Sequence, residues 1–333
     1  MRRPATKVSS GPITAGSPGA RSGGLPPVGL PVDLSAQSNR IGERIIKVLL
    51  AGSAFLSVVI TAAIVVALIA PLFTFFQNVT IWEFLTGTTW TAGFGSKTSW
   101  TDKEWGVLPL VAGTLSTTII ALLVAVPLGL GAATYLAEYA DERIRRVVKP
   151  ILEILAGVPT VVYGVFALTM VTPLLQDWVG AQIFNNLSPG IVMGFMIVPT
   201  VASLSEDAMS AVPHAMREGS YALGANRMQT TVRVVFPAAL SGIVAAIVLG
   251  LSRAVGETMI VAIAAGSQPQ FTLNPLVGAQ TMTGFIAQVA SGDAPQGSPV
   301  YYSLFAVGAL LFFLTLLINM VSITLVRRYR QAY

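Results

Sequence analysis

The sequence predicts an all-α membrane protein with six transmembrane helices. Its composition, its charge-free segments and the placement of its basic residues all lead to this fold class. Of the 333 residues, 53% are hydrophobic and only 11% are charged. A soluble domain carries about 25% charged residues, so this chain has too few charges to cover a water-facing surface of its size. A pair of soluble domains, which the length alone would allow, is therefore excluded.

Long segments without Asp, Glu, Lys or Arg locate the predicted helices. A helix that crosses the bilayer needs about 20 consecutive apolar residues, and six stretches reach this length once their polar and Gly/Pro-rich ends are removed. These spans lie near 48–76, 109–135, 151–175, 189–211, 238–265 and 301–326. They form a transmembrane domain over 39–333, in which the proline-containing stretch 266–300 predicts a long loop. Residues 1–38 are rich in Gly, Pro and Ser and predict a disordered N-terminal tail.

Basic residues orient the predicted helices. Of the 20 Lys and Arg residues, 17 precede the first span, follow the last one, or lie in the loops after the second and fourth spans. Only Lys97 and Lys103 lie in the loops on the other side. Because cytoplasmic loops carry the excess of Lys and Arg, both termini are predicted to be cytoplasmic. The net charge of +5 is then a topology signal, and a nucleic-acid partner is not expected.

Residue counts also exclude several kinds of chemistry. The chain has no cysteine and one histidine, which excludes disulfides and thiolate metal sites and leaves too few imidazoles for most zinc or haem sites. We expect no metal, no cofactor and no enzymatic activity of its own.

All five tryptophans fall on the predicted external side, four of them in the loop after the first span. They fit an aromatic belt at the membrane interface. A docking surface for an extracellular partner is the alternative.

The cytoplasmic segment 213–237, PHAMREGSYALGANRMQTTVRVVFP, predicts a short structured projection below the membrane. Small and apolar residues precede Gly224, and Met228, Val232 and Val235 follow it at helical spacing. A helix, a turn with Gly224 in a left-handed conformation, and a second helix fit this pattern. Such a projection suits docking in a groove of a partner protein.

This segment resembles the EAA loop of ABC-importer permeases, E-A-A-x-x-x-G-x9-I-x-L-P. Glu218, Gly224 and Pro237 match that pattern, while Val234 and Phe236 stand for its Ile and Leu. Two positions depart from it, because Gly219 and Ser220 replace the alanines and weaken the start of the helix. The resemblance implies that these seven residues couple the chain to an ATPase.

The resemblance extends along most of 107–330 to the phosphate-specific permeases. LAGVPTVVYG (155–164), LSRAVGET (251–258) and the ending LFAVGALLFFLTLLINM carry it. The Trp-bearing first loop and the entry GVLPLVAGTL favour the PstC type over the PstA type. The family implies a six-helix, MetI-like permease of a type I ABC importer in the cytoplasmic membrane of a prokaryote. Its partners would be a second permease of the PstA type, two PstB-type ATPase subunits, an external PstS-type phosphate-binding protein, phosphate and membrane lipid.

Arg253 and Glu257 are predicted to be the only ionisable residues inside a span, four apart on one helical face. An Arg at mid-membrane costs about 3 kcal/mol on insertion scales, so both residues should face protein or water. They form either a structural ion pair or part of the substrate path. In the second case Arg253 would offer a planar fork of donors to an oxyanion.

Four other functions stay open at this stage. A PstA-type paralogue and a permease for another oxyanion would keep the same loop and a similar Arg. An ion-coupled secondary transporter would ordinarily show inverted repeats or intramembrane acidic coupling sites. A non-transporting scaffold gives no reason for an intramembrane Arg and Glu.

Overall fold

The computed structural model describes residues 40–92 and 99–329, so the predicted tail at 1–38 lies outside the described residues. Within that part of the chain the regular structure is helical, apart from one isolated bridge between Trp90 and Trp105. Six helical segments are long and apolar enough to cross a membrane: Gly42–Asn78, Leu108–Tyr139, Thr160–Val179, Leu187–Ser210, Arg227–Val255 and Pro299–Thr324. The predicted fold class is confirmed.

The first helix, α1 (Arg40–Asn78), belongs to two units of the chain. Residues 42–61 lie in the first unit, and every side chain there is exposed although most are apolar. The second unit runs from Ala62 to the C-terminus and holds the remaining elements.

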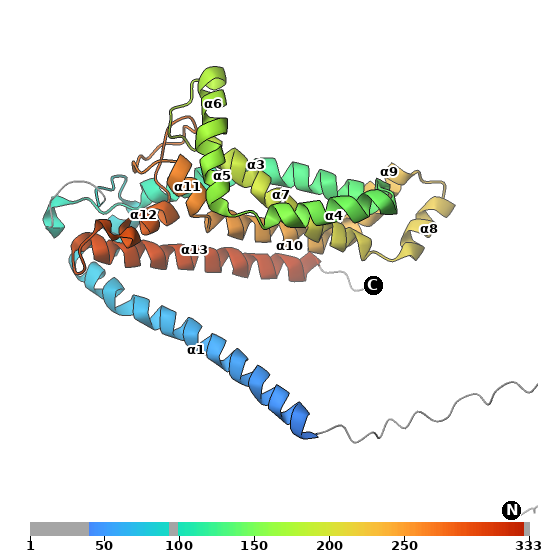
Figure 1. The fold of residues 1–333 in the computed structure, drawn as a ribbon, viewed down its shortest axis with the longest axis horizontal. Coiled ribbons are helices and arrows are strands. Elements are labelled where there is room, and N and C mark those ends of the chain that lie inside the picture. The colour runs from blue at the N-terminus through green and yellow to red at the C-terminus, as the bar shows by residue number, and fades with distance from the viewer. Residues whose placement is uncertain (1–39, 93–98, 330–333) are drawn as a thin grey trace, which may run out of the picture. The chain divides into compact units, whose positions relative to one another are not determined.

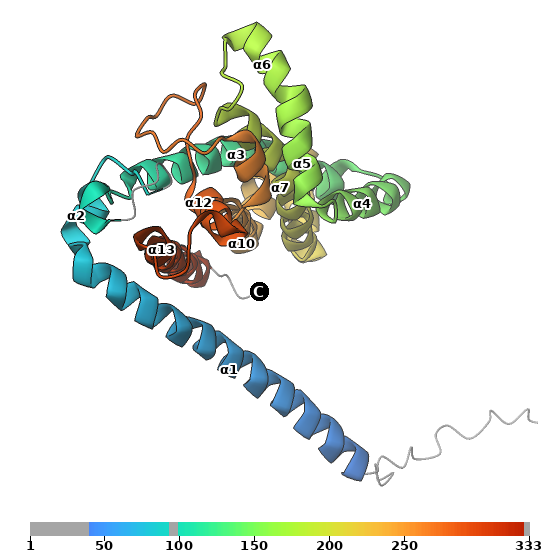
Figure 2. The same ribbon diagram turned by 60° about the vertical axis from the view of Figure 1, so that its left-hand side comes forward.

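Four long helices of the second unit lie side by side: α3 (Leu108–Thr134), α7 (Leu187–Ser210), α10 (Phe236–Val255) and α13 (Pro299–Tyr329) (Figures 1 and 2). Glycines bring α3 and α7 close together. A Cβ atom on Gly190 would lie 2.7 Å from the side chain of Ile120, and one on Gly194 would lie 2.6 Å from that of Val124. Small residues allow such close approach where lipid gives helices no hydrophobic reason to associate.

Two predicted spans are not continuous helices. The third is divided into α4 (Glu142–Ala156) and the run α5 (Thr160–Phe166), η3 (Ala167–Val171) and α6 (Thr172–Val179). Pro159 disfavours helical backbone at the residue before it and donates no hydrogen bond, so the chain turns at Gly157–Pro159 and α5–α6 leaves the bundle steeply (Figures 1 and 2). The fifth ends at Val255, and α11 (Met259–Ala264) follows a break.

The described parts of the loop after α1, residues 79–92 and 99–107, fold into a compact cap. It contains α2 (Ile81–Thr86) and η1 (Trp100–Asp102), and it packs with α12 (Met282–Gln288) and the turn η5 (Val289–Asp293). Trp90 and Trp105 are each 2% exposed and lie edge-on to each other at 6.0 Å. These two tryptophans are therefore core residues. Their burial fits neither an aromatic belt at the membrane interface nor a docking surface. Trp82 and Trp178 are exposed.

Candidate functional site

The segment 213–237 has the predicted helix–turn–helix form. It consists of α8 (His214–Ala222), α9 (Arg227–Thr230) and the π-helical turn η4 (Thr231–Val235), which leads into α10. Gly224 has φ +83°, a left-handed conformation that glycine adopts without steric cost. Asn226 and Gln229 form a reciprocal capping box that starts α9. We call residues 213–237 the coupling loop.

The tip of the coupling loop presents apolar side chains to solvent. Leu223 is 90% exposed and Met228 is 68% exposed. Glu218 and Gly219 are exposed beside them on α8. A projecting apolar tip with a fixed backbone is suited to a groove on another protein.

The other predicted coupling residues hold the loop together. The hydroxyl groups of Ser220 and Thr230 lie 2.9 Å apart and join α8 to α9. Phe236 packs on the buried cluster around Met209 and Ile243, while Pro237 occupies the first turn of α10, directly after the π-helical turn η4. Half-buried Val234 lies in the turn that precedes them. These three residues thus anchor the start of α10, and the exposed tip lies elsewhere.

Arg253 and Glu257 do not form the predicted pair on one helical face. α10 ends between them, and the described residues contain no ion pair joining them. The Glu257 carboxylate instead accepts the N–H groups of Met259 (3.0 Å) and Ile260 (3.3 Å), which start α11. Arg253 is half-buried, and its Nη1 lies 3.3 Å from the Thr200 hydroxyl on α7. The break at Gly256 lets Glu257 cap a helix N-terminus, where a carboxylate is stabilised.

The prediction of only two intramembrane ionisable residues is also wrong. Glu206 on α7 is fully buried in a candidate span, and Glu138 at the end of another is 6% exposed. Glu206 pairs with Arg145 and with Lys149 Nζ (2.8 Å) on α4, and its Oε1 accepts the Ser210 hydroxyl (3.0 Å). The two basic partners, Arg145 and Lys149, are about 60 residues away from Glu206 along the chain, so no local spacing indicates them.

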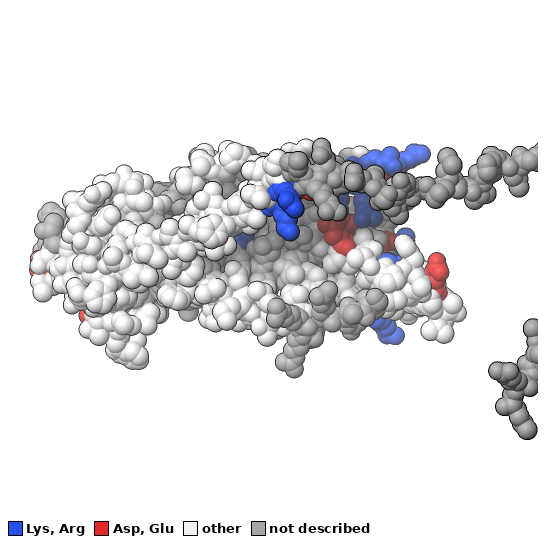
Figure 3. Space-filling view, turned by 90° about the horizontal axis from the view of Figure 1, so that it is seen from below, with Lys and Arg blue, Asp and Glu red and all other residues white. Residues whose placement is uncertain are grey.

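Lys149 also donates to Asp207 at 2.6 Å, and the hydrogen bonds that it donates to Asp207, and next to Glu206, raise the pKa of the Lys149 ammonium. The two carboxylates fasten α4, with its four basic residues, to the end of α7. On the face shown in Figure 3, charged side chains gather toward the end of the molecule where Figure 1 places α8 and α9. The remainder of that face is almost uncharged.

Lys149→Met is expected to lower the free energy of unfolding by about 1–3 kcal/mol, because it removes donors to a buried carboxylate. The raised folded-state pKa fixes the pH dependence of this loss. The stabilisation is fully present below the unfolded-state pKa of about 10.4 and disappears as the pH rises through the folded-state value. Thermal unfolding in detergent at several pH values measures it. Arg143→Met, which alters an exposed residue of the same helix, is the control. An equal loss in both variants, or a pH-independent difference, contradicts this prediction.

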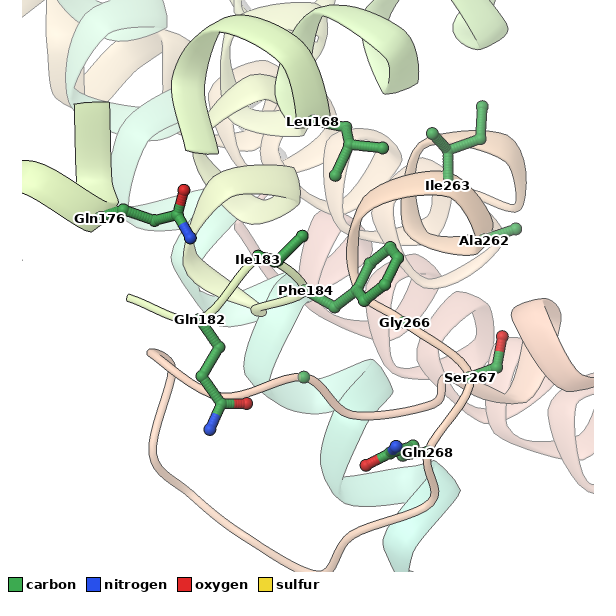
Figure 4. Close-up of a pocket in the computed structure, with 11 residues that line it drawn as sticks. Leu168, Gln176, Gln182, Ile183, Phe184, Ala262, Ile263, Gly266, Ser267 and Gln268 are labelled. Atoms are coloured by element: carbon green, nitrogen blue, oxygen red, sulfur yellow. The ribbon is translucent and has the colours of Figure 1, made fainter. Parts of the chain in front are cut away.

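An open cavity of about 910 Å³ lies beside α11 (Figure 4). Its polar lining comes from Gln176, Gln182, Ser267 and Gln268, and its apolar lining includes Phe184. None of its eleven lining residues is charged. The cavity therefore offers neutral hydrogen-bonding groups next to the helix that Glu257 caps.

Comparison with known proteins gives one family match. The family described as "Binding-protein-dependent transport system inner membrane component" matches residues 125–331. The probable ABC transporter permease protein YqgH of Bacillus subtilis is 36% identical over 236 residues, which cover 71% of this chain and 74% of that protein. The phosphate transport system permease protein PstC 1 of Mycobacterium tuberculosis is 34% identical over 285 residues, which cover 74% and 82%.

Solved structures share the fold. The bacterial ABC transporter involved in the import of the acidic polysaccharide alginate superimposes with a TM-score of 0.58 at 18% identity, over 88% of this chain and 100% of that one. The MetNI methionine ABC transporter in an inward-facing conformation gives a TM-score of 0.51 at 23% identity, over 68% and 95%. At these identities the likeness concerns the fold alone, which is the predicted MetI-like permease fold.

Proposed function

This chain belongs to the family of binding-protein-dependent transport system inner membrane components, and from that premise we propose that it is the PstC-type permease subunit of an ATP-driven importer of inorganic phosphate. Membership makes it a multi-pass inner-membrane permease subunit of an ABC importer. The finer assignment adds the substrate, the energy source and the partner subunits. Those partners are a PstA-type permease, two PstB-type ATPases and an external PstS-type phosphate-binding protein.

One observation carries the substrate class. The Arg253 guanidinium lies in a candidate span, half-buried, and within the described chain it has a hydroxyl partner but no carboxylate partner. A guanidinium fork that is not neutralised offers two parallel donors to a phosphate. The curated relatives named as phosphate transport permeases are consistent with that ligand.

The orientation and mechanism follow from the coupling loop. Lys and Arg side chains gather toward its end of the molecule, with acidic residues among them (Figure 3), and the positive-inside rule, which counts Lys and Arg, supports a cytoplasmic position for that end. Both termini would then be cytoplasmic. In the proposed mechanism the ATPase subunits close and push the coupling loop, and the helices around Arg253 switch between inward- and outward-open states.

Proteoliposomes test this function directly. They contain the chain, its partner permease and the ATPase subunits, with ATP inside and the binding protein outside. We expect accumulation of radiolabelled phosphate that requires ATP and the binding protein. Unlabelled phosphate in large excess should suppress it, and sulfate or molybdate at the same excess should not.

Competition by another oxyanion would transfer the assignment to that substrate. Uptake driven by an ion gradient without ATP would identify a secondary transporter instead.

A further inference from the structure

The π-helical turn η2 (Tyr135–Tyr139), at the end of α3, receives one side chain from each arm of the coupling loop. Arg217 of α8 contacts Glu138, and Arg227 of α9 contacts Tyr139. In each contact the two partners are about 80 to 90 positions apart along the chain. Two adjacent residues of one turn therefore hold both helices of the loop.

Arg217 makes an extensive set of hydrogen bonds for a residue on a cytoplasmic loop. Its Nε and Nη2 donate to Glu138 Oε1 at 3.2 and 2.9 Å. Nη2 also donates to the Met209 carbonyl at 2.8 Å, and Nη1 donates to the Val212 carbonyl. Met209 lies in the last turn of α7, where backbone acceptors lack regular intrahelical partners, and Val212 lies two residues beyond the end of that helix. One guanidinium thus ties α8 to α7 and to the end of α3.

Burial makes this contact different from a surface ion pair. The Arg217 and Glu138 side chains are 11% and 3% exposed. A buried ion pair is weak evidence for stability, because apolar side chains of similar volume often serve as well. The pair does fix the orientation of α8 relative to η2, since the planar guanidinium fork accepts hydrogen-bond partners in few orientations. The geometry therefore indicates a joint that resists rotation of α8 against α3.

The second contact is weaker. The Arg227 guanidinium carbon lies 5.3 Å from the centre of the Tyr139 ring, a cation–π distance. Arg227 is exposed, and such contacts contribute about 0.5–1 kcal/mol. Arg227 therefore steadies α9, and Arg217 carries the main connection.

The position of η2 connects the loop to the rest of the transmembrane unit. The Ala140 N–H donates to the Tyr135 carbonyl at 2.8 Å, which closes the wide π turn. π-helical turns are rare in proteins, and those that do occur often lie at functional sites. Two residues later the chain begins α4, which Glu206 fastens to α7. A displacement of η2 would thus act on α3 and α4 together.

We propose that the buried pair of Arg217 and Glu138 transmits the displacement of the coupling loop to α3, with Arg217 as a positioning residue for transport. This inference rests on the proposed function. It identifies a joint inside the chain, whereas the proposed function concerns the contact with the ATPase and the substrate.

The double variant Glu138→Met with Arg217→Met separates transmission from stability. It removes both charges and keeps the side-chain volume, so the complex should assemble. In proteoliposomes we expect ATP hydrolysis to continue and phosphate transported per ATP to fall at least about tenfold, equivalent to about 1.4 kcal/mol of coupling. The matched control is Glu142→Met with Arg146→Met, an exposed pair at 2.9 Å on α4, which should leave the ratio unchanged.

Arg217→Lys provides a graded test. A lysine keeps the charge but lacks the fork, so transport per ATP should lie between that of the wild type and that of the double variant. If the assembled double variant transports as much phosphate per ATP as the wild type, the proposal is overturned. A wild-type complex that moves no phosphate contradicts the proposed function instead, so the two failures are distinguishable.

A covalent link tests the joint even if the double methionine variant does not assemble. The chain has no cysteine, so Glu138→Cys with Arg217→Cys introduces a unique thiol pair. Before cross-linking, transport per ATP should be low. A short cross-linker with two thiol-reactive maleimide groups adds to both thiols, rejoins α8 to η2 and should restore it. Failure of the cross-linked, assembled protein to regain transport contradicts the transmission role.

Discussion

Gly224→Asp is expected to reduce phosphate uptake at least about tenfold, while the chain stays in the membrane. A tenfold change corresponds to a free-energy difference of about 1.4 kcal/mol. Gly224 lies next to Leu223 at the exposed tip of the coupling loop, and a Cβ atom there would meet no neighbour within 4 Å. The substitution therefore does not clash within the chain. It places a carboxylate on the surface that, under the proposed function, enters a groove of the ATPase, where an unpaired charge is costly to desolvate.

Gly224→Asn is the matched control, because Asn has the same shape as Asp and also tolerates the left-handed conformation. It should retain most of the uptake. Co-purification of the ATPase, ATP hydrolysis and uptake are measured for both variants. An Asp variant that binds the ATPase and transports normally contradicts the docking role. An equal loss in the Asn variant would assign the effect to backbone strain at φ +83°.

Glu218→Lys extends the same test to α8. Glu218 is exposed, and its side chain has no hydrogen-bond or ion-pair partner among the described residues. Its charge can therefore matter mainly to a partner protein. Reversal should uncouple hydrolysis from uptake, and the neutral Glu218→Gln should have a smaller effect.

Hydropathy was sufficient to predict the number of spans but not their continuity. The third and fifth predicted spans are apolar across their breaks, so an average over a window registers no interruption. The breaks depend on backbone chemistry, at Pro159 in one case and at Gly256–Thr258 in the other. Prolines also lie inside α3 and α7 at Pro127 and Pro199 without ending them. A proline alone was therefore not a reliable boundary.

The coupling loop was predictable because its pattern is local. Gly224 and the flanking helices lie within 25 residues, and the left-handed turn follows from the glycine. The pairs of Arg217 with Glu138 and of Lys149 with Glu206 join residues 79 and 57 positions apart. Only the folded bundle brings them together. In the sequence, Glu138 only follows the predicted span 109–135 and Glu206 lies near the end of the predicted span 189–211, and neither position identifies a basic partner.

The spacing of Arg253 and Glu257 wrongly predicts that they share one helical face, and the reason is physical. A separation of four places two side chains together only on a continuous helix. Here the helix ends at Val255, and Glu257 satisfies the backbone N–H groups of the next helix. An ion pair was therefore the wrong description, and the two residues have separate tasks.

Arg253→Leu is expected to abolish phosphate uptake by the assembled complex. Because Arg253 bonds to the Thr200 hydroxyl and not to a carboxylate, the substitution leaves no buried anion unpaired. Insertion should become easier, since an Arg at mid-membrane costs about 3 kcal/mol on insertion scales. Assembly should therefore survive, and the loss of uptake would report the missing cation. A loss of at least about tenfold corresponds to about 1.4 kcal/mol.

Three further variants distinguish the contributions at this site. Arg253→Lys keeps the charge without the fork and should retain partial uptake. Thr200→Val removes only the 3.3 Å hydrogen bond and should have a small effect. Glu257→Gln keeps one oxygen to accept the N–H groups at the start of α11, so it should be milder than Arg253→Leu. Near-normal uptake by an assembled Arg253→Leu complex would show that the anion passes without this guanidinium, and would remove Arg253 from the substrate path.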